Sequence, residues 1–197
     1  MHVDIPTLET ERLRLRPFRD DDLDDYAELC ADPEVTRWLP IGRPVRREAA
    51  WRVMALYVGH WLLRGSGQWV VEEKETSAFV GRAGFCEPPG WPGFELAGAQ
   101  LRRFWGRGYA LEVGRALLRY AFTVLGKDRV ISCILPENLA AIRVVERLGE
   151  TLQGPTQIEG KELLVYGIDR EAWERAVVRR SRSERAPGAL RAGPRGL

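Results

Sequence analysis

The hydrophobic positions change their spacing from segment to segment, and each spacing predicts a different kind of element. Between Glu11 and Phe18 polar and apolar residues alternate, which places Leu13 and Leu15 on one face of a half-buried strand. The nearly continuous apolar run over 129–135 predicts a strand that is covered on both faces. Between Gly108 and Leu125 apolar residues recur every three or four positions, which predicts a helix.

The other segments complete the expected order of elements. The patterns predict further strands over 68–74, 78–85, 94–101, 151–158 and 163–168, and further helices from Asp20, over 33–38, over 46–63 and over 140–148. The order is strand, two or three helices, three strands, helix, strand, helix and two strands, which predicts one α+β domain over 1–178. From about Arg179 the chain is rich in Arg, Ser, Gly, Ala and Pro, which predicts a basic, disordered tail over 179–197.

A glycine turn between a predicted strand and a predicted helix is the strongest candidate for chemistry. It reads Arg103-Phe104-Trp105-Gly106-Arg107-Gly108-Tyr109-Ala110. Two glycines one residue apart leave backbone amides uncovered at a helix N-terminus, where the helix dipole favours an anion such as pyrophosphate. An ordinary strand-to-helix turn explains the octapeptide alone equally well, because short glycine motifs occur often by chance.

Spacing excludes two familiar nucleotide motifs. A dinucleotide fingerprint needs a third small residue where Leu111 stands, and a Walker loop needs a Gly-Lys-Ser/Thr sequence that this chain lacks. The remaining pattern, Arg-x-x-Gly-x-Gly, is similar to the Gln/Arg-x-x-Gly-x-Gly/Ala signature of the GCN5-related N-acetyltransferases (the GNAT family).

Composition narrows the class of protein. The formal net charge of +2 is too small to indicate a nucleic acid or membrane partner. Three scattered cysteines and two histidines predict neither a zinc site nor a disulfide framework. The absence of a long apolar run and of a signal-peptide core leads us to expect a cytoplasmic protein.

A second motif extends the resemblance over most of the chain. Asn138-Leu-Ala-Ala-Ile-Arg-Val-Val-Glu-Arg-Leu-Gly149 is similar to a segment of the RimJ/RimL-type acetylases, which modify the N-termini of ribosomal proteins. Glu11-Arg-Leu-Arg-Leu-Arg-Pro17 and Glu95-Leu-Ala97 resemble two strands of the same subfamily. The resemblance implies a three-layer fold: a mixed, mostly antiparallel sheet, flanked by helices, whose parallel central strands splay apart.

The resemblance also implies that acetyl-CoA is the co-substrate. Its pantetheine arm would lie between the splayed strands and its pyrophosphate on the glycine turn. The residues implied to bind it are Leu101, Arg102, Arg103, Trp105, Gly106, Arg107, Gly108, Tyr109, Ala110, Asn138 and Arg143. Asn138 is also suited to capping a helix, since three helix-forming residues follow it, and we expect it to serve both roles. Arg143 is equally suited to a solvated helix face.

Catalysis in such a family is direct attack of an amine on the thioester. Glu95 stands where many relatives carry a general base, although a solvent-facing strand residue explains it equally well. Proton donors usual in the family are replaced here by Ala141 and Val145, which leaves water, Tyr109 or Tyr166 as donors. Glu150 replaces a usual aromatic residue, and we expect it to be exposed or to contact a cation.

The acceptor is expected to be a primary amine, either a protein N-terminus or a small molecule. A second hypothesis is an acyl-CoA-binding module with weak or no turnover, because of Ala141 and Val145. A third is contact of the arginine-rich tail with RNA or the ribosome. The sequence does not choose between a monomer and a homodimer.

Overall fold

The structure is a computed structural model that describes residues 4–185, with side chains described to residue 179. Its strands form one eight-stranded sheet in the order β1-β2-β3-β4-β5-β6-β8-β7. The strands are β1 (Leu8–Glu9), β2 (Leu13–Arg16), β3 (Gln68–Glu73), β4 (Phe79–Cys86), β5 (Glu95–Gln100), β6 (Arg129–Ile134), β7 (Thr151–Ile158) and β8 (Lys161–Asp169). The helices are α1 (Leu23–Ala31), α2 (Pro33–Thr36), α3 (Arg47–Arg64), α4 (Tyr109–Thr123), α5 (Leu139–Leu148) and α6 (Arg170–Arg185).

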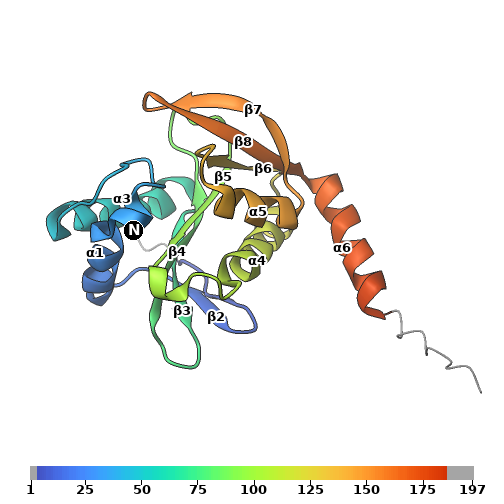
Figure 1. Ribbon diagram of the computed structural model, residues 1–197. Coiled ribbons are helices and arrows are strands. Elements are labelled where there is room, and N and C mark those ends of the chain that lie inside the picture. The colour runs from blue at the N-terminus through green and yellow to red at the C-terminus, as the bar shows by residue number, and fades with distance from the viewer. Residues whose placement is uncertain (1–3, 186–197) are drawn as a thin grey trace, which may run out of the picture.

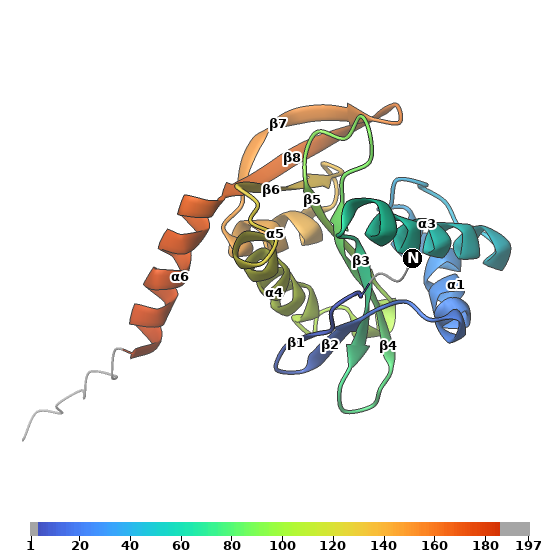
Figure 2. The same ribbon diagram turned by 180° about the vertical axis from the view of Figure 1, so that it is seen from behind.

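The helices cover both faces of the sheet, so the predicted α+β class and three-layer arrangement are confirmed. Helices α1 and α3 lie on one face, while α4 and α5 lie on the other (Figures 1 and 2). Neighbouring strands are antiparallel except β5 and β6, which are parallel. Each helix and strand predicted from the sequence is present within one to three residues of its expected bounds.

The central strands carry the core. Leu13 and Leu15 of β2 are fully buried, as their alternation predicts. On the α4 face of the sheet the ring of Trp69 meets Phe85 and Tyr120 edge to face, with centroids 6.0 Å and 5.6 Å away. Edge-to-face contacts of this kind add to the burial energy of the rings.

Helices α4 and α5 pack together at a glycine. A β-carbon at Gly114 would lie 2.6 Å from Cδ1 of Leu148, which is closer than two carbon atoms can approach. Glycine in a helix interior is less stable than alanine by about 1 kcal/mol, and here it allows the close packing of Leu148 against α4.

The acidic run that begins at Asp20 opens α1, as predicted, through a short 3₁₀ turn (Asp20–Asp22). One carboxylate of the run has a second use, because buried Asp22 accepts two hydrogen bonds from the guanidinium of Arg16, at 2.7 and 2.8 Å. Arg16 also donates to Glu72 of β3 at 2.7 Å. This carboxylate therefore anchors β2 to the start of α1.

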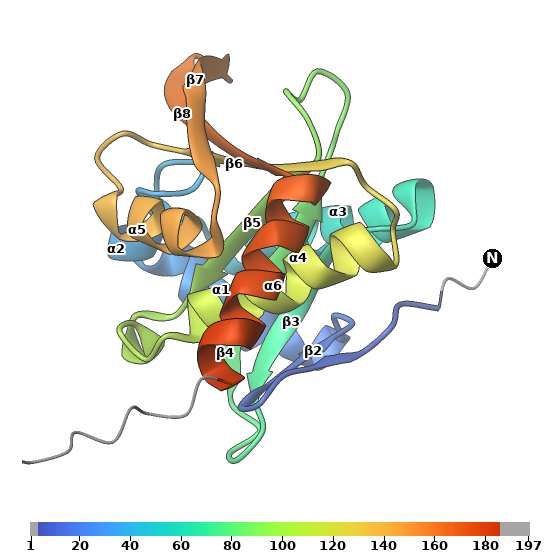
Figure 3. The ribbon, with the colours of Figure 1, turned by 90° about the vertical axis from the view of Figure 1, so that its right-hand side faces the viewer.

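The C-terminal segment differs from its prediction. Helix α6 continues to Arg185, so residues 179–185 are helical and not a disordered tail; the rest of the predicted tail lies outside the described residues. The helix leaves the body beside the end of α4 (Figure 3), where the rings of Trp173 and Phe122 pack at a tilt with their centroids 5.1 Å apart. Two features went unpredicted, α6 and the two-residue strand β1.

Of the helices described, none is long and apolar enough to cross a membrane.

Candidate active site

Strands β5 and β6 pair at one position only and then separate. Glu95 lies opposite Ile131, and the Ile131 amide donates to the Phe94 carbonyl at 3.0 Å. The predicted splay of parallel strands is thus present, and it begins at Glu95. A gap between two strands exposes backbone groups that an extended ligand can pair with.

Glu95 lies at the vertex of this gap and is 6% exposed. Its Oε2 accepts a hydrogen bond from Trp91 Nε1 at 2.6 Å, and its Oε1 accepts one from the Cys133 amide at 3.2 Å. Burial raises the pKa of Glu95 to about 6, because it outweighs these two hydrogen bonds, which lower the pKa. The interpretation of Glu95 as a solvent-facing residue is therefore wrong.

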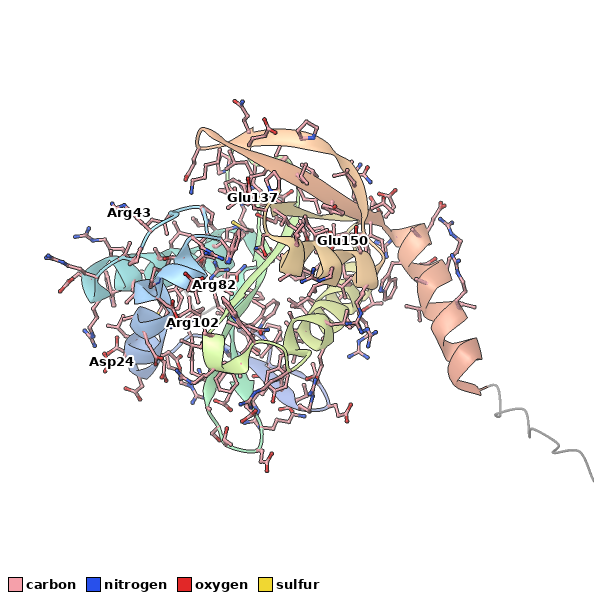
Figure 4. All side chains as sticks on the ribbon, viewed as in Figure 1. Asp24, Arg43, Arg82, Arg102, Glu137 and Glu150 are labelled. Atoms are coloured by element: carbon pink, nitrogen blue, oxygen red, sulfur yellow. The ribbon has the colours of Figure 1, made fainter. Side chains whose placement is uncertain are left out.

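Glu150 is also buried, against the expectation that it would be exposed or touch a cation. Gly149 ends α5 in the left-handed region, with φ 102°, and turns Glu150 inward to an exposed fraction of 3%. Oε1 of Glu150 lies 3.2 Å from Oγ of Ser132, and burial raises the pKa of Glu150 to about 8. Figure 4 shows Glu150 beside α5. The prediction assumed a charged carboxylate, which is costly to bury. A carboxyl that stays protonated carries no charge and can be buried without that cost.

The glycine turn has the backbone geometry that an anion site needs. Gly106 and Gly108 have φ of 76° and 78°, in the left-handed region that favours glycine. Gly108 is the N-cap of α4 and provides no side-chain cap, so the first amides of the helix face outward. Trp105, Gly106, Arg107, Gly108 and Ala110 are exposed.

The buried residues of the turn anchor it. Leu101, Phe104 and Tyr109 point into the core. The Tyr109 hydroxyl donates to Glu73 of β3 at 2.5 Å. Of these residues, Leu101 and Tyr109 can therefore offer a ligand their backbone but not their side chains.

The two arginines of the turn and the preceding Arg102 are engaged in ion pairs. Arg102 pairs with Asp32 at 2.6 Å, Arg103 with Glu28 at 2.5 Å and Arg107 with Glu73 at 3.3 Å. These pairs join the turn to α1, α2 and β3. All three arginines are partly exposed, so phosphates could still compete for their guanidinium groups.

The two implied ligands on α5 differ in their surroundings. Oδ1 of Asn138 accepts a hydrogen bond from the Ala141 amide at 3.2 Å, so Asn138 is the N-cap of α5. Its side-chain amide group has no protein acceptor within residues 4–185. Arg143 is exposed and makes no ion pair with any described residue.

Ala141 and Val145, which replace the usual proton donors, share a small cluster with Tyr166 of β8. This cluster also contains Ile134, Ile142 and Leu164. Tyr166 lies directly opposite Ser132 in the sheet, so both side chains face α5. Glu95 lies on the other face of the sheet, toward α1 and α3.

Sequence reasoning missed three neighbours of these groups. Ser132 belongs to an apolar run, and the loop position of Trp91 gave no sign of its bond to Glu95. Arg82 of β4 is 5% exposed and donates to Gln68 Oε1 at 3.0 Å, on the α1 and α3 face (Figure 4). No local pattern marks such pairs, because the partners are distant in sequence.

The chain matches known acetyltransferases over most of its length. The model of the acetyltransferase (GNAT) domain matches residues 12–151. The N-acetyltransferase p20 of Bacillus licheniformis, which is uncharacterised, is 32% identical over 75% of this chain and 84% of its own length. The FsC-acetyl coenzyme A-N(2)-transacetylase of Aspergillus fumigatus is 32% identical over 86% of this chain and 79% of its own length.

A solved structure supports the same conclusion. The acetyltransferase from Agrobacterium tumefaciens superimposes with a TM-score of 0.76 and 32% identity, over 85% of this chain and 96% of its own. The chain therefore belongs to the GNAT family of acetyltransferases.

Proposed function

We propose that the protein transfers the acetyl group of acetyl-CoA to a primary amine by direct attack of the amine on the thioester. The observation that carries this proposal is the position of Glu95, which is buried at the vertex of the only parallel strand pair within residues 4–185. The name of the Aspergillus relative supports the donor and the acceptor atom, since it specifies acetyl coenzyme A and a nitrogen.

Each bond change has a candidate group. The amine nitrogen forms a bond to the acetyl carbon while the carbon–sulfur bond breaks, and Glu95 accepts the proton that the nitrogen loses. With a pKa of about 6, Glu95 is ionised at neutral pH and can act as a base. Backbone amides of β5 exposed by the splay stabilise the oxyanion.

The phosphate seat is the part of the proposal that a binding experiment tests most directly. The Gly108→Trp variant places a large side chain over the amides of the turn at φ 78°, so we expect loss of acetyl-CoA binding in titration calorimetry. Gly126→Trp is the matched control: φ is 66° and no atom lies within 4 Å of its β-carbon position, so the strain is similar but the site is intact. If Gly108→Trp binds acetyl-CoA like this control, the assigned seat is wrong.

Tyr166 is our candidate acid for the thiolate that leaves. It occupies the cluster that contains Ala141 and Val145, where relatives carry donors, and Tyr109 is engaged by Glu73. We expect Tyr166→Phe to lower kcat about 10²-fold with little change in the KM for acetyl-CoA, because only proton transfer is lost. Tyr120→Phe on α4 serves as the control. An unchanged kcat would mean that water protonates the thiolate.

An acyl-CoA-binding module with weak or no turnover is the second candidate function. The observation in its favour is that neither Ala141 nor Val145 can donate a proton. Tight binding of acetyl-CoA without thiol release, against a panel of peptides and small amines, would support this function over the first.

The class of amine acceptor is a separate part of the proposal. Resemblance to RimJ/RimL-type acetylases favours a protein N-terminus as acceptor, but one fold serves many amines. Contact of the arginine-rich tail over 179–197 with RNA or the ribosome stays a prediction, and residues 186–197 of this tail lie outside the described residues. The same amine and thiol-release panel distinguishes peptide from small-molecule acceptors.

A further inference from the structure

The backbone hydrogen bonds between β5 and β6 stop where side chains replace the backbone partners. Its next rung would join the Cys133 amide to the Leu96 carbonyl, one step beyond the bond from Ile131 to Phe94. Instead, the Cys133 amide donates to Glu95 at 3.2 Å, and the Leu96 carbonyl accepts from the Ser132 hydroxyl, also at 3.2 Å. Both backbone groups are satisfied without each other, so the strands can part at this point.

Ser132 is also hydrogen-bonded to Glu150, and the number of available protons decides which of the two groups donates. Its Oγ lies 3.2 Å from both the Leu96 carbonyl and Glu150 Oε1, but a serine hydroxyl carries one proton. The carbonyl can only accept. When Ser132 donates to Leu96, the bond between Ser132 and Glu150 therefore needs a proton from Glu150.

The surroundings of Glu150 favour the neutral acid. The carboxyl is 3% exposed, and its Oε2 has no partner among the described residues. The Ser132 hydroxyl of β6 contacts it directly. Glu95 of β5 and Cys133 of β6 lie on the opposite face of the sheet and act on it through their charge, and none of these three groups is a cation. Burial and the charge of Glu95 both oppose ionisation, in agreement with a pKa of about 8.

We propose that Glu150 is a positioning residue: as a neutral acid it donates to Ser132, keeps Ser132 on the Leu96 carbonyl, and so holds the gap between β5 and β6 open for the pantetheine arm. This inference rests on the proposed use of the gap by acetyl-CoA. An ionised Glu150 could only accept a hydrogen bond, so the Ser132 hydroxyl would turn to donate to Glu150. The Leu96 carbonyl would then lose its donor and be free to pair across the gap.

Binding of acetyl-CoA as a function of pH tests this proposal without involving an amine. In titration calorimetry between pH 6.5 and 9.5 we expect the affinity of the wild type to fall about tenfold above pH 8, which corresponds to the loss of one hydrogen bond. Glu150→Gln keeps a neutral donor, so its affinity should not change over this range. Ser132→Ala should bind about tenfold more weakly at every pH, and Ser132→Thr should restore binding.

The control variant is Glu162→Gln, which changes an exposed carboxylate on β8 and should follow the wild type. An infrared carbonyl band of a protonated carboxyl, present in the wild type at pH 7 and absent in Glu150→Gln, would support the neutral state independently. A wild-type affinity that does not depend on pH, or an equal alkaline loss in Glu150→Gln, would overturn the proposal. No acetyl-CoA binding by the wild type at any pH would overturn the proposed function itself.

Discussion

The Glu95→Gln variant is expected to lose about 10²- to 10⁴-fold in kcat while it still binds acetyl-CoA. Glutamine has nearly the same shape, and its one oxygen can still accept from the Cys133 amide or from Trp91. It cannot take a proton from the attacking amine. The wild-type rate should also rise through pH 6 as Glu95 ionises, because burial raises the pKa of its carboxyl to about 6.

Thiol release under saturating acetyl-CoA measures this effect. Glu87→Gln, just beyond β4, changes a partly exposed carboxylate and should retain wild-type turnover. The comparison of the two pH profiles separates ionisation of Glu95 from ionisation of the amine, which is common to both variants. Turnover of Glu95→Gln within a few-fold of the wild type would exclude Glu95 as the base.

Glu150→Gln is expected to change how the stability of the protein depends on pH. An unfolded glutamate loses its proton near pH 4.5, whereas burial keeps Glu150 protonated to about pH 8 in the folded state. The folded state therefore holds an extra proton between these values, and the free energy of unfolding of the wild type falls as pH rises through this window. Glutamine has no proton to lose, so the variant lacks this contribution.

The window from pH 6.5 to pH 8 isolates this effect, since Glu95 titrates below it. Over these 1.5 pH units the free energy of unfolding of Glu150→Gln should rise by about 2 kcal/mol relative to that of the wild type. Urea unfolding at the two pH values measures the difference, with Glu162→Gln as the exposed control. Equal pH slopes in the wild type and Glu150→Gln would show that Glu150 is ionised in the folded protein.

Much of the fold followed from local patterns. The apolar spacing of residues 108–125 and the covered strand over 129–135 each predicted an element correctly. The splay at Glu95 came from the family resemblance, since no local pattern encodes where two parallel strands part. Helix α6 was missed because its arginine-rich composition resembles that of a solvated tail, and its contact with Phe122 joins distant parts of the chain.

The site was harder to predict than the fold because its chemistry depends on burial. Glu95 and Glu150 look like ordinary surface residues in sequence, and only the packing of β6, α5 and the Trp91 loop shows that both are enclosed. Asn138 illustrates the opposite case, because its position before three helix-forming residues predicted its cap correctly. Whether Asn138 and Arg143 also contact acetyl-CoA remains a prediction.

The glycine at the crossing of α4 and α5 has a consequence for the geometry of the cofactor. The N-terminus of α4 carries the proposed pyrophosphate seat, and the N-terminus of α5 carries Asn138. The Leu148 side chain fills the space that a side chain at position 114 would need, so α4 and α5 pack more closely than a larger residue there would permit without a shift. If acetyl-CoA binds as we propose, this packing sets the distance between its pyrophosphate seat and its pantetheine contact at Asn138, and a larger residue at position 114 would lengthen that distance.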